Sequence, residues 1–175
     1  LPGLIGGFIT LVVSPLISLM RDQCASLQKR GVTAVYLSSE TAAERKLLFS
    51  GQTAVVFVTP ERCLTFLDQV HLIKDREVGL VAVDEAHCIS DWGHDFRPDY
   101  RRIVKVLQAL PANIPVLATT ATANNRVVED VVRQLGRLRV QRGPLIRQSL
   151  RLQNIIMPSP ATRMAWMAEQ LPKIQ

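Results

Sequence analysis

The chain has 175 residues, which is enough for one well-formed hydrophobic core. Its apolar content of 47% excludes a disordered chain, and the longest apolar stretch, residues 1–13, is too short and too rich in glycine for a membrane-spanning helix. No basic segment precedes this stretch as in a signal peptide, so we expect a cytoplasmic protein that does not contact a membrane. The three cysteines lie far apart and form no CxxC pair, which favours reduced thiols over a zinc site.

The net charge of +6 is unevenly distributed along the chain. Residues 1–130 contain 13 basic and 14 acidic side chains, whereas residues 131–175 contain 8 basic side chains and 1 acidic one. This asymmetry indicates either a surface for nucleic acid or an acidic partner, or a solvated surface beside a neighbouring domain.

Strand-like and helix-like segments alternate between residues 8 and 135. Short β-branched runs predict strands, and the amphipathic segments between them, several of which open on a capping residue or a proline, predict helices. In chain order we expect a strand at 8–13, a helix at 14–30 ended by Gly31, a strand at 33–37, a helix at 41–49, a strand at 54–58, a helix from 59, a strand at 79–83, a helix at 100–110, a strand at 115–118 and a helix at 124–135. After Gly136 the pattern weakens to short strands at 138–140 and within 145–156, then a last helix at 161–171.

Continuously apolar strands separated by helices indicate a parallel sheet that is covered by helices on both faces, and so an α/β fold. Four of the expected strands end at polar residues, namely Ser14-Pro15, Thr59-Pro60, Asp84-Glu85 and Thr119-Thr120. In such a sheet these turns lie along one edge, where α/β proteins bind their ligands.

The run Asp84-Glu85-Ala86-His87 after the strand at 79–83 is typical of a Walker B site. A carboxylate there can hold Mg²⁺ through water, and the adjacent Glu can orient and deprotonate a water that attacks a γ-phosphate. The alternative is a plain helix start, since the helix dipole favours acidic residues. The residues that follow combine flat aromatic rings with cations, as nucleic-acid-binding surfaces do, although isolated aromatic residues more often belong to a core.

At this point the chain resembles the RecQ-type DNA helicases of superfamily 2, over residues 8–135. The matching segments are residues 11–23 for motif Ia, 58–62 for motif Ib, 84–87 for motif II, 88–98 for the aromatic-rich loop and 120–122 for motif III. The resemblance implies a RecA-like domain of the P-loop NTPase type, with ATP and Mg²⁺ as cofactors and DNA, single-stranded or with a single-stranded overhang, as the partner. Asp91 departs from the family, which commonly has Gln there, and its negative charge would weaken or retune the DNA contact.

The resemblance also implies a role for each matching residue. Asp84 would hold Mg²⁺ through water, Glu85 would act as the base, and His87 would complete the catalytic set. The nucleotide would contact Asp84, Glu85, Thr120 and Thr122. The phosphates of the DNA strand would contact Ser14, Pro15, Thr59, Pro60 and Arg62, and single-stranded DNA would contact Trp92, His94, Phe96 and Arg97.

A nucleotide triphosphatase of this type also needs a Gly-rich loop ending in Gly-Lys, which holds the β- and γ-phosphates, yet no Gly-Lys pair occurs anywhere in the sequence. We therefore expect residues 1–140 to be most of a first RecA-like domain without motif I, and residues 141–175 to be a basic passage towards a second RecA-like domain that the chain lacks. The intact protein would be an ATP-dependent DNA helicase that moves 3′ to 5′. This chain alone would be inactive.

Two other interpretations stay open. One is a non-enzymatic nucleic-acid-binding or regulatory module derived from a helicase domain. The other is a scaffolding α/β domain whose basic tail binds a protein partner. An RNA helicase with a similar Asp-Glu-Ala-His run is disfavoured, because such proteins lack the aromatic-rich loop.

Overall fold

The computed structural model describes residues 2–37, 46–48, 52–70, 77–92, 95–136, 138–143, 149–150 and 153–173. Its contacts divide the chain into two units, Leu1–Arg139 and Val140–Gln175. The first unit contains a sheet and the helices around it, and the described residues of the second include an α-helix and a short 3-10 helix.

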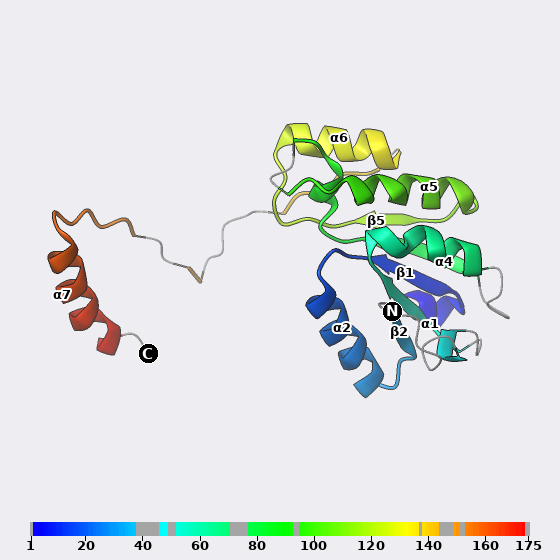
Figure 1. The fold of residues 1–175 in the computed structure, drawn as a ribbon, viewed down its shortest axis with the longest axis horizontal. Coiled ribbons are helices and arrows are strands. Elements are labelled where there is room, and N and C mark those ends of the chain that lie inside the picture. The colour runs from blue at the N-terminus through cyan, green and yellow to red at the C-terminus, as the bar shows by residue number, and fades with distance from the viewer. Residues whose placement is uncertain are drawn as a thin grey trace. The chain divides into compact units, whose positions relative to one another are not determined.

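The first unit is built on a parallel sheet of five strands in the order β2-β3-β1-β4-β5. The strands are β1 Ile9–Val13, β2 Ala34–Leu37, β3 Val55–Val58, β4 Val78–Val83 and β5 Val116–Ala118. All five coincide within a few residues with the runs predicted as strands, and the parallel α/β fold expected from the sequence is confirmed (Figure 1).

Helices cover both faces of this sheet (Figure 1). They are α1 Pro2–Gly6, α2 Ile17–Lys29, α4 Cys63–Val70, α5 Arg101–Ala109 and α6 Asn125–Leu135. Side chains of α4, α5 and α6 share one buried cluster with every second strand residue, such as Leu11 and Val56. Met20 and Cys24 of α2 pack in a second cluster with the alternate residues, including Phe57. Two-sided burial explains why β1, β2 and β3 are almost continuously apolar rather than alternating.

Helix α2 begins later than the capping pattern predicted. Ser14 and Pro15 were expected to open it, but the first helical residue is Ile17, and Leu16 occupies the N-cap position without a side-chain cap. The Ser14 hydroxyl instead donates to the Asp84 carboxylate, 3.3 Å away. The helix end is as expected, because Gly31 takes a left-handed conformation (φ 77°) directly after the C-cap.

The sequence pattern did not predict α1, because three glycines obscure its short apolar run. Gly3 has a packing reason there: a Cβ at this position would lie 2.8 Å from the Phe8 carbonyl oxygen and 3.0 Å from that of Ala54. The helix can therefore approach the sheet only with a glycine at this point.

In the second unit, helix α7 spans Pro160–Gln170 and continues as the short 3-10 helix η4, Leu171–Lys173. Ser159 caps it by accepting a hydrogen bond from the Thr162 backbone N–H at 3.2 Å. The short strand expected at 138–140 is wrong, and so is the expectation of a strand within 145–156 for its described residues, 149–150 and 153–156, since these residues pair with no other strand that the structure describes. A strand needs such a neighbour to satisfy its backbone groups.

Two expectations concern residues outside the described ranges. Only residues 46–48 of the helix predicted at 41–49 are described, and they are helical. Most of residues 145–152 lie outside the described part of the chain as well. Among the helices that the structure does describe, none has the length and apolar character that crossing a bilayer requires.

Candidate functional site

Four strands end side by side at one edge of the sheet. The register pairs Val13 with Val58 on one side and with Val83 on the other, and Val83 in turn with Ala118. The residues that follow these positions are Thr59, Ser14, Asp84 and Thr119, in their order across the sheet. The prediction that the polar turns lie together at one edge of the sheet is therefore confirmed.

Asp84 is held from three directions. One carboxylate oxygen accepts from the Ser14 hydroxyl at 3.3 Å, and the other accepts from the Thr119 hydroxyl at 3.0 Å. The backbone carbonyl of Asp84 accepts from the hydroxyl of Tyr100 at 2.9 Å. A carboxylate offers about four acceptor positions, so this one keeps free lone pairs for a water or a cation.

Glu85 has the only positive φ of any non-glycine residue in the described part of the chain, at 49°. This left-handed conformation costs about 1–2 kcal/mol and persists only where surrounding structure imposes it. The restraint comes from both sides: the Ala86 N–H donates to the Thr119 carbonyl at 2.9 Å, and the Cys88 N–H donates to the Glu85 carbonyl at 2.9 Å. The turn separates the directions of the Asp84 and Glu85 carboxylates.

His87 joins the carboxylate run to the threonine segment after β5. The ring is buried, with Nδ1 at 3.2 Å from a carboxylate oxygen of Glu85 and at 2.9 Å from the Thr120 hydroxyl. A carboxylate can only accept, which places a proton on Nδ1. Thr120 is in turn bonded to the backbone of Thr122, so hydrogen bonds connect His87 to both threonines.

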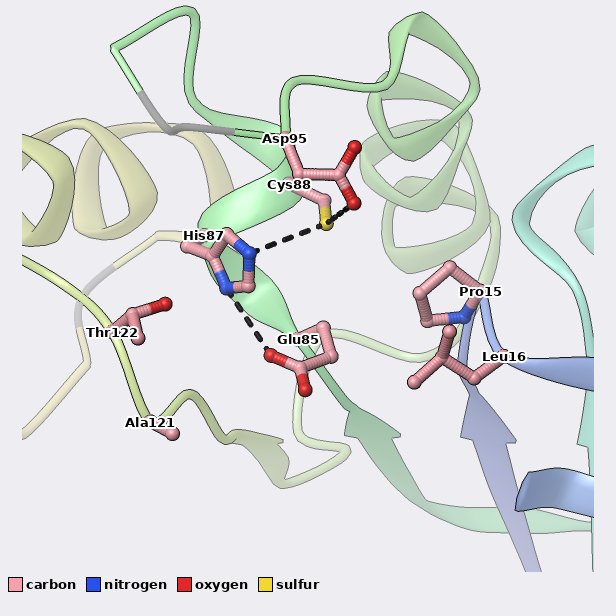
Figure 2. A pocket seen from close by; sticks show the side chains of 8 residues that line it. All are labelled: Pro15, Leu16, Glu85, His87, Cys88, Asp95, Ala121 and Thr122. Carbon is pink, nitrogen blue, oxygen red and sulfur yellow. Dashed lines mark hydrogen bonds and ion pairs between the residues drawn. The ribbon is translucent and has the colours of Figure 1, made fainter. Parts of the chain in front are cut away.

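A cavity of about 220 Å³ opens beside these groups. Its wall is formed by Pro15, Leu16, Glu85, His87, Cys88, Asp95, Ala121 and Thr122 (Figure 2). It brings together residues from the turn after β1, the run after β4, the following loop and the turn after β5. Asp84 is not part of this wall, because its carboxylate is turned towards Ser14 and Thr119.

Cys88 bridges His87 and Asp95 across the cavity wall. Its Sγ lies 3.7 Å from His87 Nε2 and 3.9 Å from an Asp95 carboxylate oxygen (Figure 2). Burial, followed by the nearby Asp95 charge, raises the pKa of the Cys88 thiol to about 11, so it stays protonated at neutral pH. One S–H proton therefore faces two acceptors. The sequence had predicted only a reduced thiol for this residue, with no role in the site.

The aromatic-rich loop begins directly after this run. Arg97 donates from Nη2 to Asp95 at 3.1 Å and from its backbone N–H to the Cys88 carbonyl at 2.9 Å. Trp92 is 57% exposed and Phe96 is half-buried. His94, the fourth predicted DNA contact in this loop, lies outside the described residues.

The DNA contacts predicted after β1 and β3 differ in their accessibility. Ser14 and Thr59 are 1% and 8% exposed, and Pro60 is buried as well. Pro15 and Arg62 are half-buried, with some surface open to a ligand. Their contact with DNA phosphates stays a prediction.

Thr119 was expected in a polar turn at the sheet edge but was given no role, and the structure shows that its hydroxyl donates to Asp84. Tyr100 is the site residue that sequence reasoning missed. Tyr100 lies sixteen residues from Asp84, at the end of the 3-10 helix η3 Pro98–Tyr100, and nothing in the sequence pattern connects the two.

In the described part of the chain, no three His, Cys, Asp or Glu side chains gather in a way that could hold a metal ion. Mg²⁺ needs fewer protein ligands, because it keeps several waters and binds through one or two carboxylates plus phosphate oxygens. The half-buried Asp84 carboxylate fits that requirement in its donor atoms.

Comparison with known proteins gives consistent results. The DEAD/DEAH box helicase family matches residues 4–131. ATP-dependent DNA helicase RecQ from Pasteurella multocida is 44% identical over 140 residues, which cover 77% of this chain and 22% of that protein. The protein of the same name from Bacillus subtilis is 41% identical over 141 residues, covering 77% and 24%. The chain thus spans about a quarter of the length of these relatives.

Solved structures show the same fold. Mss116p, determined in a complex with ssRNA and AMP-PNP, aligns with a TM-score of 0.56 and 20% identity over 73% of this chain and 27% of that one. The helicase domain of Hef from Pyrococcus furiosus aligns with a TM-score of 0.51 and 19% identity over 74% and 27%. These neighbours confirm the RecA-like fold, and the curated relatives confirm the resemblance to RecQ-type helicases. With a family match that covers most of its length, the chain belongs to the DEAD/DEAH box helicases.

Proposed function

We propose that this chain is a single-stranded-DNA-contacting part of a RecQ-type, ATP-dependent DNA helicase. The observation that carries the proposal is the continuity of residues 84–97. One segment runs from the carboxylates at the sheet edge, through His87 and Cys88, to an exposed tryptophan and an arginine. The similarity to relatives named as ATP-dependent DNA helicases supports it.

In the intact protein, Asp84 would hold Mg²⁺ through water. Hydrolysis of the bound ATP, in which the γ-phosphoryl group is transferred to water, would drive 3′ to 5′ translocation. Glu85 would orient the attacking water and accept its proton. His87, fixed between Glu85 and Thr120, would report the state of that carboxylate to the segment at 120–122. We expect no ATP hydrolysis by this chain alone, because no Gly-Lys pair is present to hold the phosphates.

The test is binding of a fluorescent single-stranded oligonucleotide to the 175-residue chain at several salt concentrations. Trp92→Ala should weaken binding about fivefold or more, because a base stacked on an aromatic ring contributes about 1–3 kcal/mol. Trp166→Ala is the matched control, since Trp166 is also partly exposed, at 40%, but lies in α7. Equal losses for the two variants would contradict a specific role for the loop.

A non-enzymatic nucleic-acid-binding module is the second candidate, and the missing Gly-Lys pair favours it. DNA-stimulated ATP hydrolysis by the isolated chain would exclude it and would also overturn the inactivity that we expect. A Gly-Lys-Ser or Gly-Lys-Thr coding run shortly upstream of the codon for Leu1 would favour the helicase. An RNA oligonucleotide of the same sequence, bound more tightly than the DNA, would contradict the DNA assignment.

A further inference from the structure

An arginine from a helix outside the loop places its guanidinium group over each of the two aromatic rings, Trp92 and Phe96. The Arg126 guanidinium carbon, from α6, lies 3.2 Å from the centre of the Trp92 ring. The Arg101 guanidinium carbon, from α5, lies 5.3 Å from the centre of the Phe96 ring. Cations over ring faces are attractive contacts in their own right, so each pair is a stable unit of the surface.

The two arginines differ in what else they bind. Arg101 donates from Nη2 to both carboxylate oxygens of Asp91, at 2.8 Å and 2.7 Å. Arg126 is exposed and forms no ion pair with any residue that the structure describes. The charge of Arg101 is therefore neutralised by Asp91, whereas the guanidinium of Arg126 can bind an anion.

The Trp92–Arg126 pair has the two features that a nucleotide needs. A guanidinium close to the ring centre covers one face of the indole, yet the side chain remains 57% exposed, so the opposite face is open. A base can stack on that face, and an arginine binds phosphate oxygens through its planar fork of donors. Base and phosphate are joined in one nucleotide, so the two contacts can be made together.

We propose that Trp92 and Arg126 together form one nucleotide-binding unit. Asp91 holds Arg101 in its ion pair over Phe96, and this pairing prevents Phe96 and Arg101 from binding a second nucleotide in the same way. The inference rests on the proposed binding of single-stranded DNA and adds to it one binding residue, Arg126, and one residue that limits binding, Asp91. Asp91 is the position at which the chain departs from the family's common Gln. A neutral amide there cannot form the ion pair with Arg101 and would leave that guanidinium free for a phosphate.

The first arm of the test is the salt dependence of oligonucleotide binding by the full chain. Arg126→Ala should weaken binding about three- to tenfold and make the negative slope of log K against log salt shallower by about 0.7, the value for one single-strand phosphate contact. Arg126→Lys keeps the charge but not the planar stack, so it should keep the slope while binding more weakly. Arg133→Ala is the matched control, because Arg133 lies in the same helix but pairs with Asp130 at 3.7 Å.

The second arm is Asp91→Gln, which should tighten binding and make the negative slope of log K against log salt steeper by about 0.7. Adding Arg101→Ala to Asp91→Gln should cancel that gain, since the released guanidinium is its source. A gain that survives the second substitution would show that only the negative charge of Asp91 matters, and would overturn the proposed lock on Arg101.

A spectroscopic readout locates the base. In a Trp166→Phe background, Trp92 is the sole tryptophan, and a stacked base should quench its fluorescence in proportion to binding. Binding by the unchanged chain, together with no loss in Arg126→Ala, would overturn the nucleotide-binding unit and leave the proposed function standing. The absence of any binding by the unchanged chain would overturn both.

Discussion

Asp84 is fixed by polar contacts at both its side chain and its backbone. Two hydroxyls donate to the carboxylate, and the Tyr100 hydroxyl donates to the carbonyl. Tyr100 is fully buried, and burial, followed by nearby negative charges including that of Asp84, raises the pKa of its phenol. The phenol therefore remains a neutral donor at neutral pH, and it fixes the turn in which the strand passes into the acidic run.

The first prediction concerns that hydroxyl. Tyr100→Phe should lower the free energy of unfolding by about 1–2 kcal/mol, because it leaves a buried carbonyl without its donor. Urea denaturation followed by far-UV circular dichroism measures the change.

Tyr36→Phe is the matched control for this substitution. Tyr36 is also buried, but its hydroxyl has no hydrogen-bond partner among the described residues. Its removal should be neutral or slightly stabilising, since no hydrogen bond is lost. Equal effects of the two substitutions would show that the Tyr100–Asp84 bond contributes nothing.

Among single residues, the sequence predicted the groups that lie in one short motif but not those that join it from elsewhere. Asp84, Glu85 and His87 were predictable because their spacing follows directly after a strand. Tyr100 was not, because its contact depends on how η3 packs, and packing leaves no local signal. The left-handed backbone of Glu85 could not be predicted either, since a glutamate does not favour that conformation.

At the scale of elements, strands were predicted better than helix starts. Strands β1, β2 and β3 are buried on both faces, so their apolar runs stand out in the sequence. A helix start depends on which donors need a cap. At Ser14 the hydroxyl bonds to Asp84, across the sheet edge, rather than to the helix that follows.

Helix α6 offers a clean test of capping. The Asn124 side chain accepts from the Val127 N–H at 2.9 Å, and the helix buries Val127, Val131 and Leu135 against the core. Asn124→Ala should lower the unfolding free energy of the first unit by about 1 kcal/mol.

Ser159→Ala removes the equivalent cap from α7, a helix with no buried residue. It should leave the unfolding of the first unit unchanged. A comparable loss in that variant would mean that the caps act through something other than the helix they begin, and chemical denaturation of both variants would reveal it.

At the scale of the whole molecule, the core of the first unit contains two thiols that resist ionisation. Cys63 begins α4 and Cys88 follows Glu85, and both belong to the cluster beneath α4, α5 and α6. Burial, with a smaller effect of Glu61, raises the pKa of the Cys63 thiol to about 12, and the pKa of Cys88 is raised to about 11.

These raised values predict loss of stability in alkali. Below pH 9, the ordinary pKa of a thiol, both states are protonated and the stability is fully present. Above it, the unfolded chain releases protons that the folded chain retains, so each pH unit lowers stability by about 1.4 kcal/mol for Cys63 until the folded pKa is reached, and by less for Cys88, whose charge solvent screens in part. Urea unfolding between pH 7.5 and 10.5, under reducing conditions, should show this fall.

A variant with Cys63→Ala and Cys88→Ala will be less stable throughout because of lost packing, but its stability should decline less steeply with pH. Parallel declines in the two proteins would mean that other groups control the alkaline unfolding.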